Sequence, residues 1–249
     1  MVVAVVVTLF GLVLGSFLNV VIYRVPRRES IVWPGSRCTS CGHDVRWHDN
    51  LPIVSWVILR GRCRDCGAPI SRRYPLVEGL TGALFLTAFL VYGLQARLVL
   101  TWAFLAMLVV ITFVDIDFLI IPDRIVLPAA AVGLAAFIAL SPSLWWEYVL
   151  AGFCAALFLL ALALVWAGGM GMGDVKMALL MGAVLGRHVV VALFVAFLVG
   201  GIVGIGLIAA KIKKRTDKIP FGPYLAAGST VAVLWGPNIL DSYLRVFRR

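Results

Sequence analysis

Apolar runs long enough to cross a lipid bilayer follow one another along almost the whole chain. About 20 apolar residues span the hydrocarbon core as a helix. Hydrophobic residues make up 62% of the sequence and charged residues 14%, whereas about a quarter of an ordinary soluble domain is charged. The sequence therefore predicts an all-α polytopic membrane protein with about eight transmembrane helices. We expect them at 1–23, 76–94, 98–114, 125–140, 148–167, 175–185, 189–210 and 221–235, of which the run at 175–185 is short for a span.

One polar stretch interrupts these runs and divides the chain into three predicted parts. They are a first transmembrane helix at 1–23, a cysteine-containing domain at 24–75 and a membrane-embedded domain at 76–249. No Lys or Arg precedes the first run, and no small-residue cleavage site ends it. We therefore expect this run to be retained and not removed as a signal peptide.

The basic residues lie mostly on one side of the expected helices. If the first helix ends in the cytoplasm, most Lys and Arg residues fall in the inner segments 24–75, 115–124, 168–176 and 211–220. Basic residues favour the cytoplasmic side, so both termini are expected outside. The net charge of +10 is then a topology signal and not a sign of nucleic-acid binding.

Four cysteines of the polar stretch form two C-x-x-C pairs, Cys38 with Cys41 and Cys63 with Cys66, each followed by a glycine. This spacing is typical of a structural zinc ribbon, in which four thiolates close a tetrahedral site. Two disulfides are the alternative, which a cytoplasmic location disfavours. We expect zinc to order an arginine-rich cytoplasmic loop that is too small to fold alone.

Three other residues with ligand chemistry have simpler interpretations. His43 and His48 are possible further ligands, but we interpret them as surface histidines. Cys154 lies alone in an apolar run, and we expect it to pack as a small hydrophobic side chain.

Two acidic residues stand where apolar runs meet the same predicted cytoplasmic interface. Asp115 follows the third run, and Asp174 follows Gly171 and Gly173 at the start of the sixth. Ionisable groups at membrane depth are costly and usually functional. Two close carboxyls share a proton, so one can activate a water while the other polarises a peptide carbonyl. The plainer interpretation is a flexible glycine loop in which Asp174 caps the next helix.

The residues around these acids have weaker signals. Asp117 would face away from Asp115 in a continuous helix, and Asp123 follows a proline in the position of an N-cap. Lys176 either tunes the acid pair, binds a substrate carboxyl, or is an ordinary interfacial lysine. Glu78 is expected to be buried early in the second run, as the partner of an arginine or as part of a second site.

Six motifs in order along the chain resemble those of the type IV prepilin peptidases, the bifunctional prepilin leader peptidase/N-methyltransferases. They lie at 15–24, in the cysteine domain around 51–56, at 74–78, at 115–123, at 171–176 and at 220–224. The resemblance implies that Asp115 and Asp174 are catalytic. Asp117, Asp123, Lys176, Glu78 and the two glycines before Asp174 are expected to support them.

The resemblance also implies a substrate and a location. The substrates are prepilins and pseudopilins, whose short basic leader is removed after a glycine at the cytoplasmic face of the bacterial inner membrane. The new N-terminal residue is then methylated from S-adenosylmethionine. The methyl-donor site is not located by sequence, because no glycine-rich nucleotide loop on a strand–helix unit is present.

Other classes of protein would use parts of the same sequence. An ion- or proton-coupled transporter would use the acids as a relay, but predicts inverted repeats and acids at mid-membrane. A non-enzymatic zinc-ribbon assembly factor would keep the cysteines and tolerate loss of either aspartate. A general G-x-G-D intramembrane protease is closer to the preferred interpretation, but would not need the ribbon.

Overall fold

The structure is a computed structural model that describes residues 1–165, 170–214 and 217–247. The end of the predicted run 148–167 and the start of the inner segment 168–176 lie outside the described residues. The chain divides into two compact units, Met1–Val110 and Ile111–Arg249, and each is described by itself. The predicted boundaries at 23/24 and 75/76 stay predictions.

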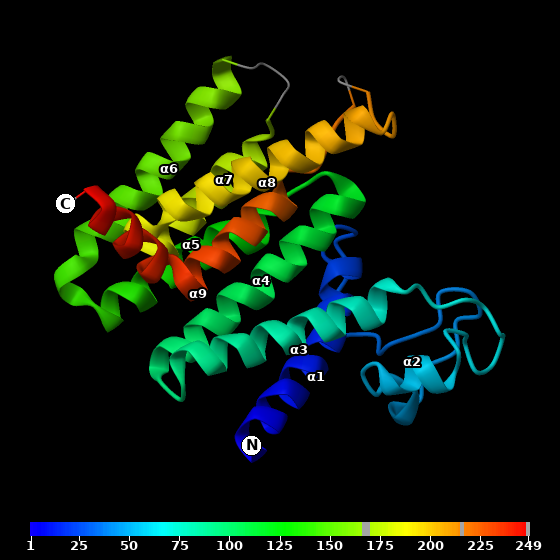
Figure 1. Ribbon diagram of the computed structural model, residues 1–249. Helices are drawn as coiled ribbons and strands as arrows, with labels where there is room; N and C mark the ends of the chain where they lie inside the picture. Colours follow the sequence, from blue (N-terminus) through cyan, green and yellow to red (C-terminus); the bar gives the residue numbers. More distant parts are fainter. Residues whose placement is uncertain (166–169, 215–216, 248–249) are drawn as a thin grey trace. The chain divides into compact units, whose positions relative to one another are not determined.

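The described residues form helices and no named strand (Figure 1). The first unit holds α1 (Val2–Arg24), the 3-10 turn η1 (Trp47–Asn50), α2 (Val54–Ile58), α3 (Arg73–Tyr92) and most of α4 (Ala96–Phe118). The second unit begins within α4 and continues with α5 (Asp123–Leu140), η2 (Pro142–Leu144), α6 (Trp145–Val165), α7 (Met172–Leu185), η3 (Gly186–His188), α8 (Val189–Ala209) and α9 (Gly222–Phe247).

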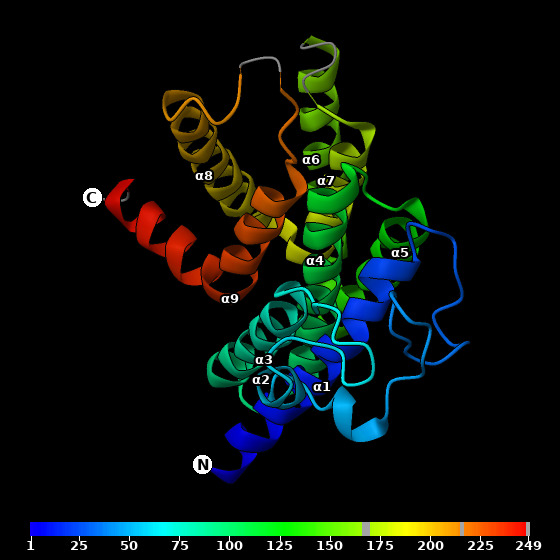
Figure 2. The ribbon, with the colours of Figure 1, turned by 90° about the vertical axis from the view of Figure 1, so that its right-hand side faces the viewer.

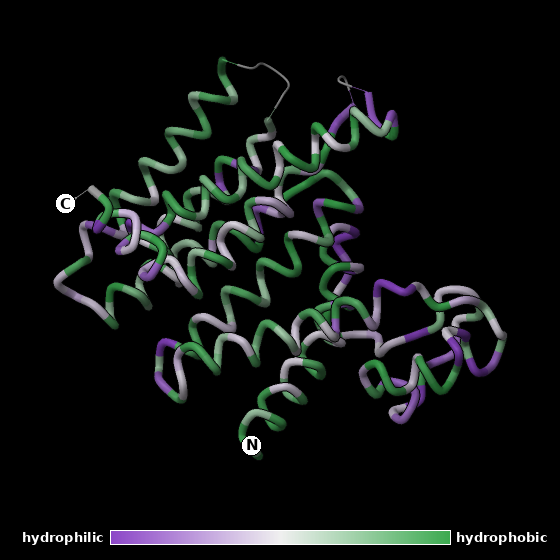
Figure 3. The backbone as a smooth tube through the Cα atoms, viewed as in Figure 1, coloured by the Kyte–Doolittle hydropathy of each residue, from purple (hydrophilic) through white to green (hydrophobic). Residues whose placement is uncertain are grey.

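Each of the predicted apolar runs coincides with one of the longer helices, so the all-α prediction is confirmed. Six stretches of the described chain are long and apolar enough to cross a membrane. One of them, Met172–Ala209, joins α7 and α8, and α9 is not among the six. The number of helices that cross the membrane therefore stays a prediction. Coloured by hydropathy, the long helices are mainly hydrophobic and the polar residues gather in the cysteine-containing loop (Figure 3).

Small residues set the packing of the first unit. A Cβ atom added to Gly11 would lie 2.8 Å from the Cα of Gly82, and one added to Gly15 would lie 2.7 Å from the Cα of Glu78. Small residues let helix backbones approach closely in membrane proteins. The helices α1 and α3 therefore pack directly along each other (Figure 2).

The short helix α7 is the most enclosed helix of the second unit. It packs against α5 and α6, and most of its residues are buried. A Cβ atom added to Gly182 would clash with the backbone of Ala151 on α6. Because its neighbours surround it, α7 is stable at 14 residues, shorter than a typical spanning helix.

The prediction that Cys154 packs as a small hydrophobic side chain is wrong, because this side chain is exposed on the surface of α6. The buried residues of that helix include Gly152, Ala155 and Leu159, which recur at helical spacing on its inner face. Cys154 falls on the outer face. Apolar character alone did not reveal which side of the helix is packed.

Candidate active site and metal site

The two C-x-x-C segments fold into knuckles with matching hydrogen bonds. In the first, the Cys38 N–H donates to the His43 carbonyl at 2.9 Å and the Gly42 N–H donates to the Cys38 carbonyl at 2.9 Å. In the second, the Cys63 N–H donates to the Ala68 carbonyl at 2.8 Å, and the Gly67 N–H to the Cys63 carbonyl at 3.0 Å. The glycine after each pair has a positive φ of 75° or 71°, which only glycine adopts readily.

The knuckles bring all four predicted metal ligands together. The sulfur atoms of Cys38, Cys41, Cys63 and Cys66 lie within 4.8 Å of one another, and those of Cys38 and Cys66 are 3.8 Å apart. A tetrahedral zinc ion with bonds of about 2.3 Å places its sulfur ligands about 3.8 Å apart. The cluster therefore suits a tetrathiolate metal site. His43 and His48 have exposed side chains, as expected of surface histidines.

The thiols of this cluster differ in acidity. Backbone hydrogen bonds from Cys41 and Ser40 lower the pKa of the Cys38 thiol to about 6. For Cys66, the Ala68 N–H lowers the thiol pKa, but burial and the neighbouring thiols outweigh it and raise that pKa to about 12. A dication would draw protons from all four sulfurs, because only thiolates bind it.

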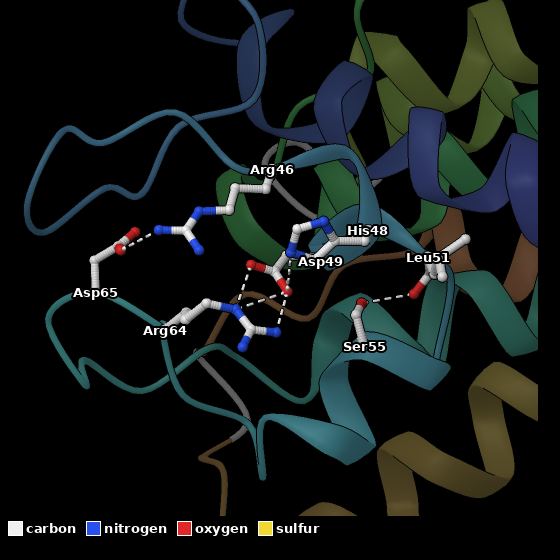
Figure 4. A network of polar contacts seen from close by, with 7 residues as sticks. All are labelled: Arg46, His48, Asp49, Leu51, Ser55, Arg64 and Asp65. Carbon is white, nitrogen blue, oxygen red and sulfur yellow. Dashed lines mark hydrogen bonds and ion pairs between the residues drawn. The ribbon is translucent and has the colours of Figure 1, made fainter.

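Outside the sulfur cluster, ion pairs connect the second knuckle to the segment that follows the first (Figure 4). Arg64, between the second pair of cysteines, donates to both carboxylate oxygens of Asp49, with Nη2–Oδ1 at 2.6 Å and Nε–Oδ2 at 2.8 Å. This hydrogen bond lowers the pKa of the Asp49 carboxyl. Arg46 reaches Asp65 at 3.3 Å. These ion pairs therefore hold the second knuckle against the segment 46–49.

Glu78 is buried in α3, as predicted, with 6% of its surface exposed. Its carboxylate accepts a hydrogen bond of 2.7 Å from the backbone N–H of Ile53, just before α2. Ile53 has a positive φ of 60°, which is rare for a β-branched residue and often marks a functional site. The Glu78 carboxylate is thus held by a backbone amide and not by an arginine.

A cavity of about 580 Å³ lies in the first unit, beside Glu78. Its lining includes Asn19, Tyr23 and Trp56. Asn19 is 1% exposed, and its Oδ1 atom has no hydrogen-bond partner among the described residues. A buried acceptor without a partner is energetically costly, so a polar ligand or a water in this cavity would satisfy Asn19 Oδ1.

In the second unit, Asp115 and Asp174 line one cavity of about 260 Å³. Asp115 lies near the end of α4 and is 5% exposed, and Asp174 lies in the first turn of α7 and is 8% exposed. The structure thus brings together the two acids that topology placed at one interface. Asp117 is also in α4, but its side chain is exposed.

The chain after α4 forms one wall of this acid cavity. Leu119 has a positive φ of 54°, so α4 ends there and the backbone turns. Leu119, Ile120 and Ile121 then line the cavity with apolar side chains. A Cβ atom added to Gly173 would lie 2.9 Å from the Cβ of Ile121, so glycine is needed where α7 begins.

Asp174 is not the N-cap of α7. The N-cap is Gly171, and Asp174 is the third helical residue. The Asp174 side chain reaches back over the first turn, and its Oδ2 atom accepts a hydrogen bond of 3.1 Å from the Gly171 N–H. This contact satisfies one of the free amide groups at the helix start.

The prediction that Asp123 caps the next helix is also wrong. Pro122 is the N-cap of α5, and Asp123, the first helical residue, makes no capping hydrogen bond. Its two carboxylate oxygens instead accept hydrogen bonds from Lys176 Nζ, both at 2.7 Å. The Asp123 carboxylate therefore pairs with α7 and does not cap α5.

Two contacts of the site residues were missed by sequence reasoning. The N–H of Gly222, at the start of α9, donates to Asp115 Oδ2 at 2.8 Å across 107 positions of the chain. The Ile53–Glu78 contact is the other. The motif at 220–224 was the available signal for the first, but a motif does not say which residue it touches.

The fold and these sites define a class of protein: a helical membrane protein with a buried pair of carboxyls and a separate tetrathiolate cluster. A family model for the "Bacterial Peptidase A24 N-terminal domain" matches residues 9–92, and one for the "Type IV leader peptidase family" matches residues 102–205. The chain belongs to the type IV leader peptidase family.

Curated relatives match over nearly their full length. A "Prepilin leader peptidase/N-methyltransferase" of Aeromonas hydrophila is 38% identical, covering 97% of this chain and 93% of the relative. Proteins of the same name from Pseudomonas aeruginosa and Bacillus subtilis are 35% and 33% identical, each over at least 92% of both chains. No solved structure matches. The family and the six candidate spans together indicate an inner-membrane protein.

Proposed function

We propose that this chain removes the leader peptide of type IV prepilins or pseudopilins after a glycine, at the cytoplasmic face of the membrane, and then N-methylates the new N-terminal residue. One observation carries the proposal. Two buried carboxyls from separate helices line a single cavity in a chain of the type IV leader peptidase family.

The paired acids supply the chemistry of cleavage. One ionised carboxylate takes a proton from a water, whose oxygen attacks the scissile carbonyl carbon. The other carboxyl, protonated, donates to the carbonyl oxygen as the tetrahedral intermediate forms. When the intermediate collapses, the C–N bond breaks and the departing amine receives a proton from the pair. Asp115 and Asp174 share these roles as one titrating unit.

The setting of the acids suits the substrate. A prepilin carries a basic leader followed by an apolar segment, so its scissile bond lies at the membrane boundary. Apolar side chains at Leu119, Ile120 and Ile121 line the same cavity as the acids. The absence of a side chain at Gly171 leaves room for an extended substrate backbone beside Asp174.

The orientation rests on charge. The inner segments of the predicted topology hold most of the Lys and Arg residues, which places the cysteine domain and the acid cavity at the cytoplasmic side. A bound zinc ion at the four cysteines would be structural. With four thiolates it has no open position for a substrate.

Methyl transfer has a candidate location in the cavity beside Glu78. S-adenosylmethionine supplies a methyl group on a sulfonium cation, which passes to the free amine of the cleaved product. The buried carboxylate of Glu78 suits a cation, and Asn19 Oδ1 can accept a hydrogen bond from an amine. The acceptor amine is free only after the C–N bond of the leader is broken, so methylation follows cleavage and cannot precede it.

Mass spectrometry of a co-expressed prepilin tests the proposal. We expect loss of the leader together with one added methyl group on the new N-terminus. A transporter or a non-enzymatic assembly factor would leave the prepilin intact. A peptidase without methyltransferase activity would give the shortened chain at its unmodified mass.

A further inference from the structure

We propose that Gly222 is a positioning residue for the peptidase reaction, because its backbone N–H holds Asp115 and its missing side chain makes room for that carboxyl. This inference rests on the proposed function and deepens it. It assigns the segment around 220–224, far from both aspartates in sequence, to the active site.

The first argument is the direction of the amide. The first N–H groups of a helix have no partner within the helix. At the start of α9, the N–H groups of Tyr224 and Leu225 both donate to the Phe221 carbonyl, and Pro223 has no N–H. The Gly222 N–H is the amide of this turn that reaches Asp115, at 2.8 Å. The positive end of the α9 dipole adds to its attraction for a carboxylate.

The second argument is steric. A Cβ atom at position 222 would lie 2.7 Å from Asp115 Oδ2 and 3.1 Å from its Cγ. Carbon atoms do not approach oxygen so closely, so any larger residue must move the carboxyl. Asp115 is 5% exposed and cannot turn freely into solvent. A single methyl group at position 222 therefore displaces a reacting group.

The third argument is that Asp115 and Asp174 are held by the same kind of hydrogen bond. Each carboxyl is held through its Oδ2 atom by the backbone N–H of a glycine, Gly222 for Asp115 and Gly171 for Asp174. Among the described residues, the Oδ1 atoms of both acids accept no hydrogen bond. One oxygen of each acid is thus fixed, and the other is left for the water and the substrate carbonyl. Fixed geometry of this kind is what makes an acid pair efficient.

Two glycines provide matched controls for a Gly222→Ala variant. Gly201, on α8, has no atom within 4 Å of an added Cβ, so Gly201→Ala tests the same chemical change in open space. Gly228, on α9, packs against the backbone of Ala192, so Gly228→Ala tests a packing defect on the same helix away from Asp115. Together they separate a positioning role from a structural one.

The experiment measures kcat and KM of leader cleavage by the three purified full-length variants, with thermal melting and methylation of a pre-cleaved peptide as measures of folding. We expect Gly222→Ala to lose about 100-fold in kcat with KM, melting and methylation unchanged. Gly201→Ala should match the wild type, and Gly228→Ala should melt earlier and lose both activities equally.

The proposal is overturned if Gly222→Ala cleaves at the wild-type rate, or if it behaves like Gly228→Ala. An Asp115→Asn variant measured in parallel separates this failure from failure of the proposed function. If Asp115→Asn is inactive and Gly222→Ala is active, only the positioning role is wrong. If both are active, Asp115 is not catalytic.

Discussion

The cysteine domain and the acid cavity of this protein are stabilised in opposite ways. In the cysteine domain, exposed or half-exposed side chains meet through ion pairs such as Arg46–Asp65, and the four sulfurs come from two neighbouring short segments. In the acid cavity, buried carboxyls from separate helices are held by backbone amides of glycines.

The difference predicts how each region responds to change. Exposed ion pairs are individually weak, so the cysteine domain depends on the ligands that a metal would join. Only a substitution to proline removes a backbone N–H group, so the acid cavity is sensitive chiefly to changes of the acids themselves and to added side-chain volume. We therefore expect the acid cavity to be the more sensitive of the two regions to substitution.

The largest effect is expected from the acids. Asp115→Asn and Asp174→Asn should each lose cleavage by at least about 100-fold, because neither amide can serve as the acid or base. A gel shift of the prepilin measures the loss, and thermal melting of the purified protein controls for folding. Near wild-type cleavage by either folded variant would contradict the paired-acid account.

The second-largest effect is expected from removal of a metal ligand. Wild-type protein should contain about one zinc per chain. The variants Cys38→Ser and Cys63→Ser should lose this zinc. Their methylation rate should fall at least as much as their cleavage rate, because the cavity beside Glu78 is lined by residues of the cysteine domain. Elemental analysis measures the metal, and Cys154→Ser is the matched control. A metal-free but fully active wild-type preparation, or two disulfides on mapping, would overturn this reading.

The smallest effect is expected at the ion pair between α5 and α7. The side chains of Lys176 and Asp123 are 33% and 55% exposed. Such pairs contribute roughly 0.2–1 kcal/mol, so Asp123→Asn should reduce cleavage only about fivefold or less. A double variant that carries both Asp123→Lys and Lys176→Asp should recover part of the cleavage activity that either single substitution loses.

Asp117→Asn should also have a small effect, because its exposed side chain lies apart from the acid cavity lining. Cleavage rates of this variant and of Asp115→Asn are compared under the same conditions. If Asp117→Asn is inactive while Asp115→Asn is active, the catalytic assignment is wrong by two residues.

The sequence predicted the helical fold and the two groups of chemical residues because each depends on local pattern. Cysteine spacing predicts the knuckles directly, and the ends of the apolar runs predict that the two acids lie close together. The side of α6 that carries Cys154 was missed, since an apolar run in a membrane helix does not distinguish packed from exposed faces.

The contacts that fix the site were beyond sequence reasoning for a different reason. Gly222 meets Asp115 through a main-chain group, which every residue possesses and which leaves no signature in the sequence. Asp123 has the sequence context of a cap, and only the approach of α7 shows that Lys176 is its partner. Such contacts depend on how distant helices pack.

One paired measurement tests most directly whether the two regions carry separate reactions. Purified Asp174→Asn protein is assayed for cleavage of an intact prepilin, and for methyl incorporation into a synthetic peptide with the mature N-terminus. We expect no cleavage and undiminished methylation. If the folded variant also loses methylation of the pre-cleaved peptide, the two reactions share one site and the account is wrong.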